Sequence, residues 1–149
     1  MRDCESVPDC VCKIPTKAIG GVEMNYRELF SLVHERPGMY GLDGSFKHFY
    51  IFVMGCDAGT SWSLLAGFRE WLIVQLNEGD NLVWPALVEL IALPSRKQIC
   101  EPLDADENTA AVETLFRLLD EFLELRKGYQ GLPNIFQEYI AWREKHHAK

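Results

Sequence analysis

"DENTAAVETLFRLLDEFLELRKG", residues 106–128, is the stretch that decides the expected fold. Its apolar side chains recur three and four positions apart, as on one face of an α-helix, and charged side chains fill the opposite face. Asp106 is the expected N-cap, because a carboxylate there can accept hydrogen bonds from first-turn amides, and Gly128 closes the helix. The expected inward residues are Val112, Leu115, Phe116, Leu119, Phe122 and Leu123, and the outward ones are Glu113, Arg117, Asp120, Glu121 and Glu124.

Two helices are expected near the start of the sequence. Asn25 can cap a helix over residues 26–35 that Pro37 prevents from extending. Ser45 can cap a second one, which begins at residue 46 and is weakened by Gly55 and Gly59. Between the two, the expected loop holds several glycines.

Three further helical patterns follow. Thr60 or Ser61 is expected to start a helix with an aromatic and leucine stripe that ends at residues 77–79. A short apolar helix follows Asn81 and stops at Pro94, with Pro85 near its start. The last helix, with Pro133 in its first turn, is expected to end in a solvated tail over residues 143–147. Its apolar residues are Leu132, Ile135, Phe136, Tyr139, Ile140 and Trp142.

These patterns predict an all-α fold, a single compact domain of about six helices over residues 24–149. Residues 1–23 hold prolines and glycines with no sustained apolar period, so they are predicted to form a flexible N-terminal arm. Residues 49–55 and 82–93 are rich in β-branched and aromatic side chains, which keeps an α+β fold as the alternative.

The charge distribution limits the partners. Residues 101–124 contain eight acidic side chains and one basic one, and thus carry a charge equal to the net charge of the whole chain, −7. Such a face repels a phosphate backbone and attracts a basic protein. No apolar run approaches the ~20 residues that a bilayer requires. We therefore expect no direct nucleic acid contact, no membrane insertion and a cytoplasmic location.

The five cysteines fit reduced thiols in the cytosol, because their number is odd and no secretion signal precedes them. Cys4, Cys10 and Cys12 lie close enough in sequence to supply three zinc ligands, but their spacing is not one of the paired metal-binding patterns. Incidental thiols on the arm are favoured, and the prediction contains no metal and no cofactor.

Residues 36–40, Arg-Pro-Gly-Met-Tyr, resemble the entry to the ATP site of gyrase B-type ATPases. That family also needs a Glu, an Asn and an Asp, whereas residues 49–62 offer only Asp57. We therefore reject the nucleotide-binding resemblance. The run is instead interpreted as a helix stop, with Met39 and Tyr40 packing back on the core.

No other set of residues predicts catalysis. Cys56 beside Asp57 would need a histidine, but His48 is eight positions away, ~12 Å along one helix. His34 would have to approach through the fold. We expect no enzyme. The aromatic residues Trp62, Phe68, Trp71 and Trp84 are interpreted as core rather than as a ligand cage.

The acidic face of the long helix is open to two interpretations. It is a solvated surface with two ordinary pairs, Glu113 with Arg117 and Arg117 with Glu121, or it is a binding surface, because Asp120, Glu121 and Glu124 lack enough neighbouring bases. As the binding hypothesis, these three acids with Glu113 and Asp106 steer a partner, and Arg36 and Tyr40 mark a second exposed loop.

Taken in order, residues 24–59, 64–76, 81–91 and 115–126 resemble a group of small bacterial immunity proteins of polymorphic-toxin systems. The resemblance spans about residues 25–142 and implies a protein that binds a cognate toxin domain and blocks it. A toxin domain that is basic around its cleft would suit the acidic face. The alternatives are a regulatory or scaffold subunit that uses exposed aromatic side chains and, less favoured, a nucleotide-binding enzyme.

Overall fold

The computed structural model describes residues 23–96, 98–99 and 101–148. Throughout these ranges the regular structure is helical and no strand occurs, which confirms the all-α prediction over the α+β alternative. The predicted arm, apart from Glu23, lies outside the described residues, and so do Cys4, Cys10 and Cys12 within it. The elements are α1 (Tyr26–Glu35), the 3-10 turn η1 (Pro37–Tyr40), α2 (Phe46–Gly59), α3 (Phe68–Leu76), α4 (Trp84–Ala92), α5 (Ala105–Leu125) and α6 (Gly131–His147).

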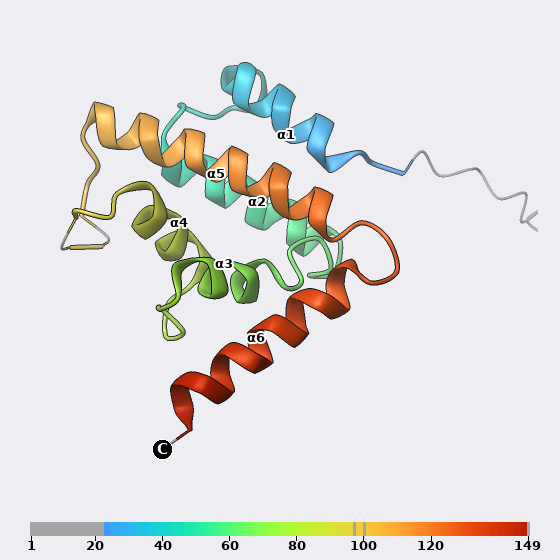
Figure 1. Ribbon diagram of the computed structural model, residues 1–149. Helices are drawn as coiled ribbons and strands as arrows, with labels where there is room; N and C mark the ends of the chain where they lie inside the picture. The colour runs from blue at the N-terminus through green and yellow to red at the C-terminus, as the bar shows by residue number, and fades with distance from the viewer. Residues whose placement is uncertain (1–22, 97, 100, 149) are drawn as a thin grey trace, which may run out of the picture.

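Helix α5 is the centre of the arrangement. Figure 1 shows it running between α1 and α4, with α2 behind it, and α5 packs against all three. Helix α6 extends away from α5 and packs mainly against α3. All six residues predicted to face inward on α5 are buried, so its opposite face is presented to solvent along its length.

The start of α5 differs from the prediction by two residues. Asp104, not Asp106, is the N-cap: its carboxylate accepts from the Glu107 backbone N–H at 2.8 Å, and the Glu107 carboxylate accepts from the Asp104 N–H at 3.0 Å. This reciprocal capping box satisfies two amides that would otherwise be unpaired, which a cap at Asp106 would not do. Asp106 therefore lies in the exposed first turn.

The third helix begins later than predicted, at Phe68. Ser61 and Trp62 adopt positive φ angles of 56° and 63°, which are incompatible with a continuing helix, and Gly67 at φ 86° precedes α3. The Asp57 carboxylate holds the turn by accepting from the Leu65 N–H at 2.9 Å. Trp62 consequently lies on the surface, 65% exposed, so its assignment to the core was wrong.

The other three aromatic residues predicted to lie in the core do so. Phe68 and Trp71 are buried, Trp84 is partly buried, and Phe68 packs against Trp84 and Phe122 with ring centroids 5.6 Å and 5.0 Å apart. Pro85 lies in the first turn of α4, as its missing N–H allows.

Helix α6 is longer than expected and less buried. It continues through residues 143–147, which were predicted to be a tail, and His147 Nε2 lies 2.7 Å from Asp80 Oδ2. Ile135 and Trp142 are buried as predicted, and the Trp142 indole donates to Asn77 at 2.9 Å. Ile140 and Phe136 are exposed, because α6 contacts the domain along a narrow stripe.

Candidate protein-binding surface

All five acidic residues proposed for partner binding lie on the solvent face of α5. Asp106, Glu113, Asp120, Glu121 and Glu124 are each exposed. Their surroundings divide them into two groups, one toward the C-terminal end of the helix and one toward its N-terminal end.

At the C-terminal end, Arg27 of α1 supplies the base that the sequence analysis found missing. Its Nε and Nη2 donate to the two oxygens of Asp120 at 2.6 and 2.9 Å, and its Nη1 donates to Glu124. Lys127 Nζ lies 2.7 Å from the same Glu124 oxygen. We call Arg27, Asp120, Glu124 and Lys127 the α1–α5 ion-pair cluster.

The pairing shifts the titration of this cluster. The hydrogen bond from Arg27 holds the pKa of Asp120 below its usual value, and the hydrogen bond from Lys127 does the same for the pKa of Glu124. The hydrogen bond to Asp120 in turn raises the pKa of Arg27. These acids are therefore stabilised in the charged state by this chain's own bases. The sequence pattern could not predict the pairing of Arg27 with Asp120, because the two residues are 93 positions apart.

Glu121 is also paired, with Arg117. The Nη1 and Oε1 atoms are 2.9 Å apart on successive turns of α5, as the spacing predicted. Both side chains are about half exposed, so the pair contributes little to stability.

At the N-terminal end of α5, the two acidic residues proposed for binding are not paired with bases in the described ranges. Across the described part of the chain, neither Asp106 nor Glu113 takes part in an ion pair or a side-chain hydrogen bond. The expected pair of Glu113 with Arg117 does not form, because Arg117 is bonded to Glu121 instead. Glu113 borders a shallow hollow of about 240 Å³ together with His34 and Pro37, so it lies beside the turn that follows α1. The hollow thus connects the acidic helix with the second predicted loop.

That turn presents its side chains to solvent. Pro37 starts the 3-10 turn η1, and Gly41 ends it at φ 72°. Met39 is 76% exposed, so it does not pack on the core as expected. Tyr40 is 37% exposed and touches Phe52 edge to face, with centroids 5.7 Å apart. Arg36 is exposed as well, and its guanidinium has no partner within the described ranges.

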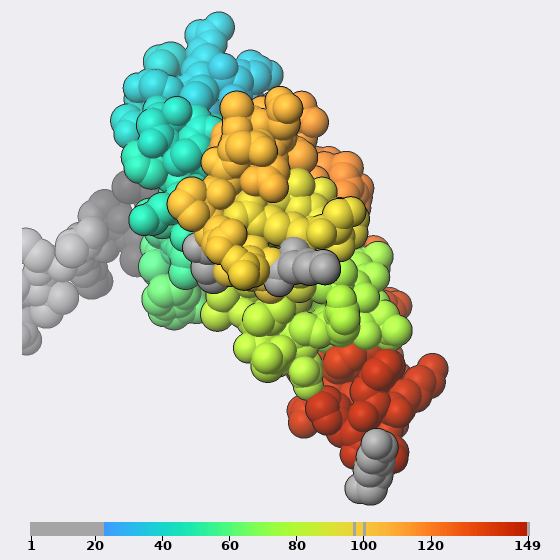
Figure 2. All heavy atoms as spheres, turned by 90° about the vertical axis from the view of Figure 1, so that its left-hand side faces the viewer, coloured from blue at the N-terminus to red at the C-terminus, as the bar shows by residue number. Residues whose placement is uncertain are grey.

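Asn108 ties the loop that follows η1, and the start of α2, to α5. Its side-chain oxygen accepts from the Phe46 N–H at 2.8 Å and its amide donates to the Gly44 carbonyl at 3.3 Å. In Figure 2 the end of α1, the following loop and the start of α5 lie together on the upper part of the molecule. We call Arg36, Met39, Tyr40, Asp106 and Glu113 the η1 surface.

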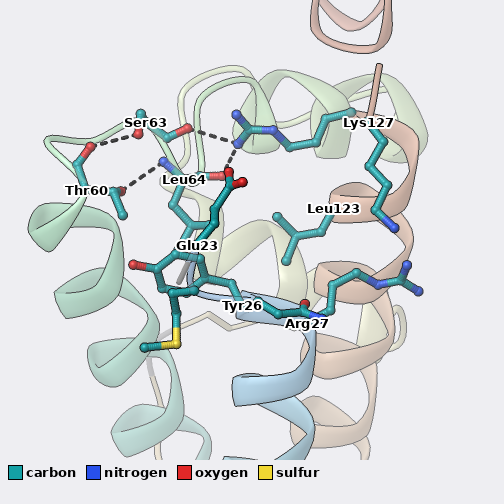
Figure 3. Close-up of a pocket in the computed structure, with 11 residues that line it drawn as sticks. Glu23, Tyr26, Arg27, Thr60, Ser63, Leu64, Leu123 and Lys127 are labelled. Carbon is teal, nitrogen blue, oxygen red and sulfur yellow. Dashed lines mark hydrogen bonds between the residues drawn. The ribbon is translucent and has the colours of Figure 1, made fainter. Parts of the chain in front are cut away.

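A groove of about 680 Å³ lies at the opposite end of α5, between the start of α1 and the α2–α3 turn (Figure 3). Arg27 and Lys127 extend toward the same side of it. Arg126 donates to the carbonyls of Ser63, at 2.9 Å, and Leu64, and so holds the turn against α5. The polar groups of this groove are therefore engaged in holding the fold together.

The residues weighed for catalysis do not form a linked set. The Asp57 carboxylate is committed to the Leu65 N–H, and His34 stacks on Phe116 with ring centroids 4.3 Å apart. Burial raises the pKa of the Cys56 thiol, which disfavours the thiolate. No group of three or more His, Cys, Asp or Glu side chains is placed to hold a metal ion in the described part of the chain.

None of the helices in the described ranges combines the length and the apolar composition needed to cross a membrane. Comparisons with protein-family models, with curated proteins and with solved structures found no match to this chain.

Proposed function

We propose that this protein is an immunity-type binding protein, which neutralises a cognate bacterial toxin domain in the cytoplasm by covering its active cleft. The observation that carries the proposal is the η1 surface: Glu113, which has no partner among the described residues, borders the same hollow as Pro37 of the turn, whose Met39 and Tyr40 side chains are exposed. Asp106, also without a described partner, lies in the exposed first turn of the same helix. Arg, Met and Tyr are enriched at the centres of protein interfaces, and charge at the rim accelerates association.

The proposed mechanism needs no chemistry from this chain. A basic toxin domain is attracted by the net charge of −7, and Asp106 and Glu113 orient it over η1. Tyr40 and Met39 then bury apolar area against the toxin. Because Asn108 ties the loop to α5, little ordering entropy is lost on binding. The remaining acids, Asp120, Glu121 and Glu124, add to the long-range field while staying paired.

The test uses the neighbouring reading frame. We expect it to encode a secreted protein whose C-terminal domain stops bacterial growth when expressed alone. Co-expression of this chain should restore growth, and the two proteins should elute together in gel filtration. Restored growth without a complex, or a complex without restored growth, would contradict neutralisation by occlusion.

A regulatory or scaffold subunit is the second candidate. The observation in its favour is a set of exposed apolar side chains on α2 and the turn after it: Ile51, Met54 and Trp62. An interface built on them would be nearly insensitive to salt, whereas one built on the η1 surface weakens as salt rises. The salt dependence of partner affinity therefore distinguishes the two candidates.

A further inference from the structure

A second groove, of about 770 Å³, lies between α2 and α4. Its walls are mostly apolar: Tyr50 and Met54 come from α2, Val83 and Trp84 from the start of α4, and Leu103 from the segment before α5. Tyr50 and Trp84 meet edge to face, with ring centroids 6.3 Å apart. A groove of this size and composition fits a small organic molecule rather than an ion.

Glu89 of α4 also lines the groove and is only 8% exposed. It is the one charged side chain that is buried among the described residues. Its Oε1 atom accepts no hydrogen bond from any described residue. A carboxylate out of water without a donor is costly, so a ligand that supplied one would gain free energy.

The neighbouring Arg96 does not fill that role. Its Nε lies 3.7 Å from Glu89 Oε1, too far for a hydrogen bond, while its Nη1 donates to Glu107 at 2.8 Å. Its other donors are directed to the backbone carbonyls of Gln98, Glu101 and Pro102. Arg96 therefore attracts Glu89 but does not satisfy its buried Oε1 atom with a hydrogen bond.

We propose that this groove binds a small amphipathic amine. The ammonium group donates to Glu89, and the aromatic or aliphatic body packs against Trp84 and Met54, where the ring face also favours a cation. Arg69 also lines the groove, but its guanidinium donates to the carbonyls of Leu82 and Asp80 and lies 4.0 Å from the Glu70 carboxylate, which offsets its charge. Lys47 is exposed at the edge of the groove, where water reduces its repulsion of the ligand without removing it.

The proposal goes beyond toxin neutralisation and does not depend on it. Calorimetric titration of the full chain with phenethylamine at neutral pH should give a dissociation constant on the order of 1 mM. Phenethyl alcohol, which has the same body without the charge, should bind at least about tenfold more weakly. Equal affinities, or no binding of either compound, would overturn the proposal.

Three variants locate the effect. Glu89→Gln should weaken phenethylamine at least about tenfold and leave the alcohol unchanged. Val83→Lys places an ammonium at a position that is 68% exposed, so folding is unaffected, and should weaken the amine about threefold. Met24→Lys adds the same charge at an exposed position in the other groove and should change nothing. If Val83→Lys and Met24→Lys behave alike, or Glu89→Gln binds as the natural chain does, the site is refuted.

Discussion

Both ends of the exposed face of α5 carry acidic side chains proposed for binding, but among the described residues only those at the C-terminal end are paired with bases. Toward the C-terminus, Asp120 and Glu124 are held by Arg27 and Lys127. Toward the N-terminus, Asp106 and Glu113 have no partner among the described residues. The first pair joins α1 to α5, whereas the second is available to another molecule. An acidic helix face is therefore not one functional unit, because tertiary neighbours decide which charges remain free.

This difference moves the proposed binding site from the C-terminal end of α5 to its N-terminal end. Asp120, Glu121 and Glu124 looked like the centre of a binding face because local bases were too few. With Arg27 in place, the free charge moves to the other end, next to Arg36 and Tyr40. The four predictions below test whether the two ends differ as described, from the largest expected effect to the smallest.

Replacing Tyr40 by Ala should have the largest effect on partner binding. A half-exposed Tyr at an interface centre costs about 2 kcal/mol or more when truncated, or roughly a thirtyfold loss of affinity. Tyr129→Ala, an exposed Tyr remote from this turn in sequence, is the matched control and should leave affinity unchanged. Calorimetric titration with the partner measures both. An equal loss in the two variants would remove η1 from the interface.

Asn108→Ala tests the frame beneath the η1 surface. The substitution removes the acceptor of the part-buried Phe46 N–H and the donor to Gly44, so the free energy of unfolding should fall by about 1–2 kcal/mol. Thr109→Ala, which loses only a hydroxyl bond to the Ala105 carbonyl on the exposed side, should cost less. Urea denaturation followed by far-UV circular dichroism measures both. Equal stabilities would show that Asn108 does not hold the loop.

The sequence was sufficient for the elements whose ends are set locally. The Asn25 and Ser45 caps, the stop at Pro37 and the buried stripe of α5 were all predicted, since each follows from neighbouring residues. One local end was missed: the capping box of Asp104 and Glu107 could have located the start of α5. The other failures were non-local or involved unusual dihedrals. The residues around Trp62 do not predict its positive φ angle. Local sequence likewise cannot predict that Arg27 pairs with Asp120, which is 93 positions away.

The buried Glu89 was missed for a different reason. In the sequence it is one polar residue in an apolar helix, which is also what a partly exposed helix shows. Only the groove formed with Tyr50 and Met54 of α2 and with Pro102 and Leu103 reveals that its carboxylate is enclosed. The candidate amine site could therefore not have been proposed from periodicity.

Charge removal compares the two ends directly. Asp106→Asn with Glu113→Gln should slow association with the partner by about threefold to tenfold at low salt, because the removed charges are free and lie at the interface. Asp120→Asn with Glu124→Gln removes the same formal charge but should slow it less, since Arg27 and Lys127 already offset those acids. Stopped-flow association at two salt concentrations measures the rates. A larger effect at the C-terminal end would reverse the assignment.

The smallest effect concerns stability in acid. The pKa values of Asp120 and Glu124 are lowered from their ordinary values of 3.8 and 4.5, so their pairing stabilises the fold above those values and is lost as pH falls through the lowered ones. Arg27→Met should remove the part of this contribution that comes from Asp120, whereas Lys127 still pairs with Glu124. Its Tm should lie at most about 2 °C below that of the natural chain near neutral pH, because the pairs are largely exposed. The two curves should then converge as pH falls below about 4.

Asp43, whose pKa is lowered mainly by hydrogen bonds from Ser45, titrates alike in both proteins, so the difference isolates the α1–α5 ion-pair cluster. A Tm difference that persists in acid would mean that Arg27 acts through the apolar part of its side chain, which lines a hollow together with Phe30 and Leu123, and not through its charge.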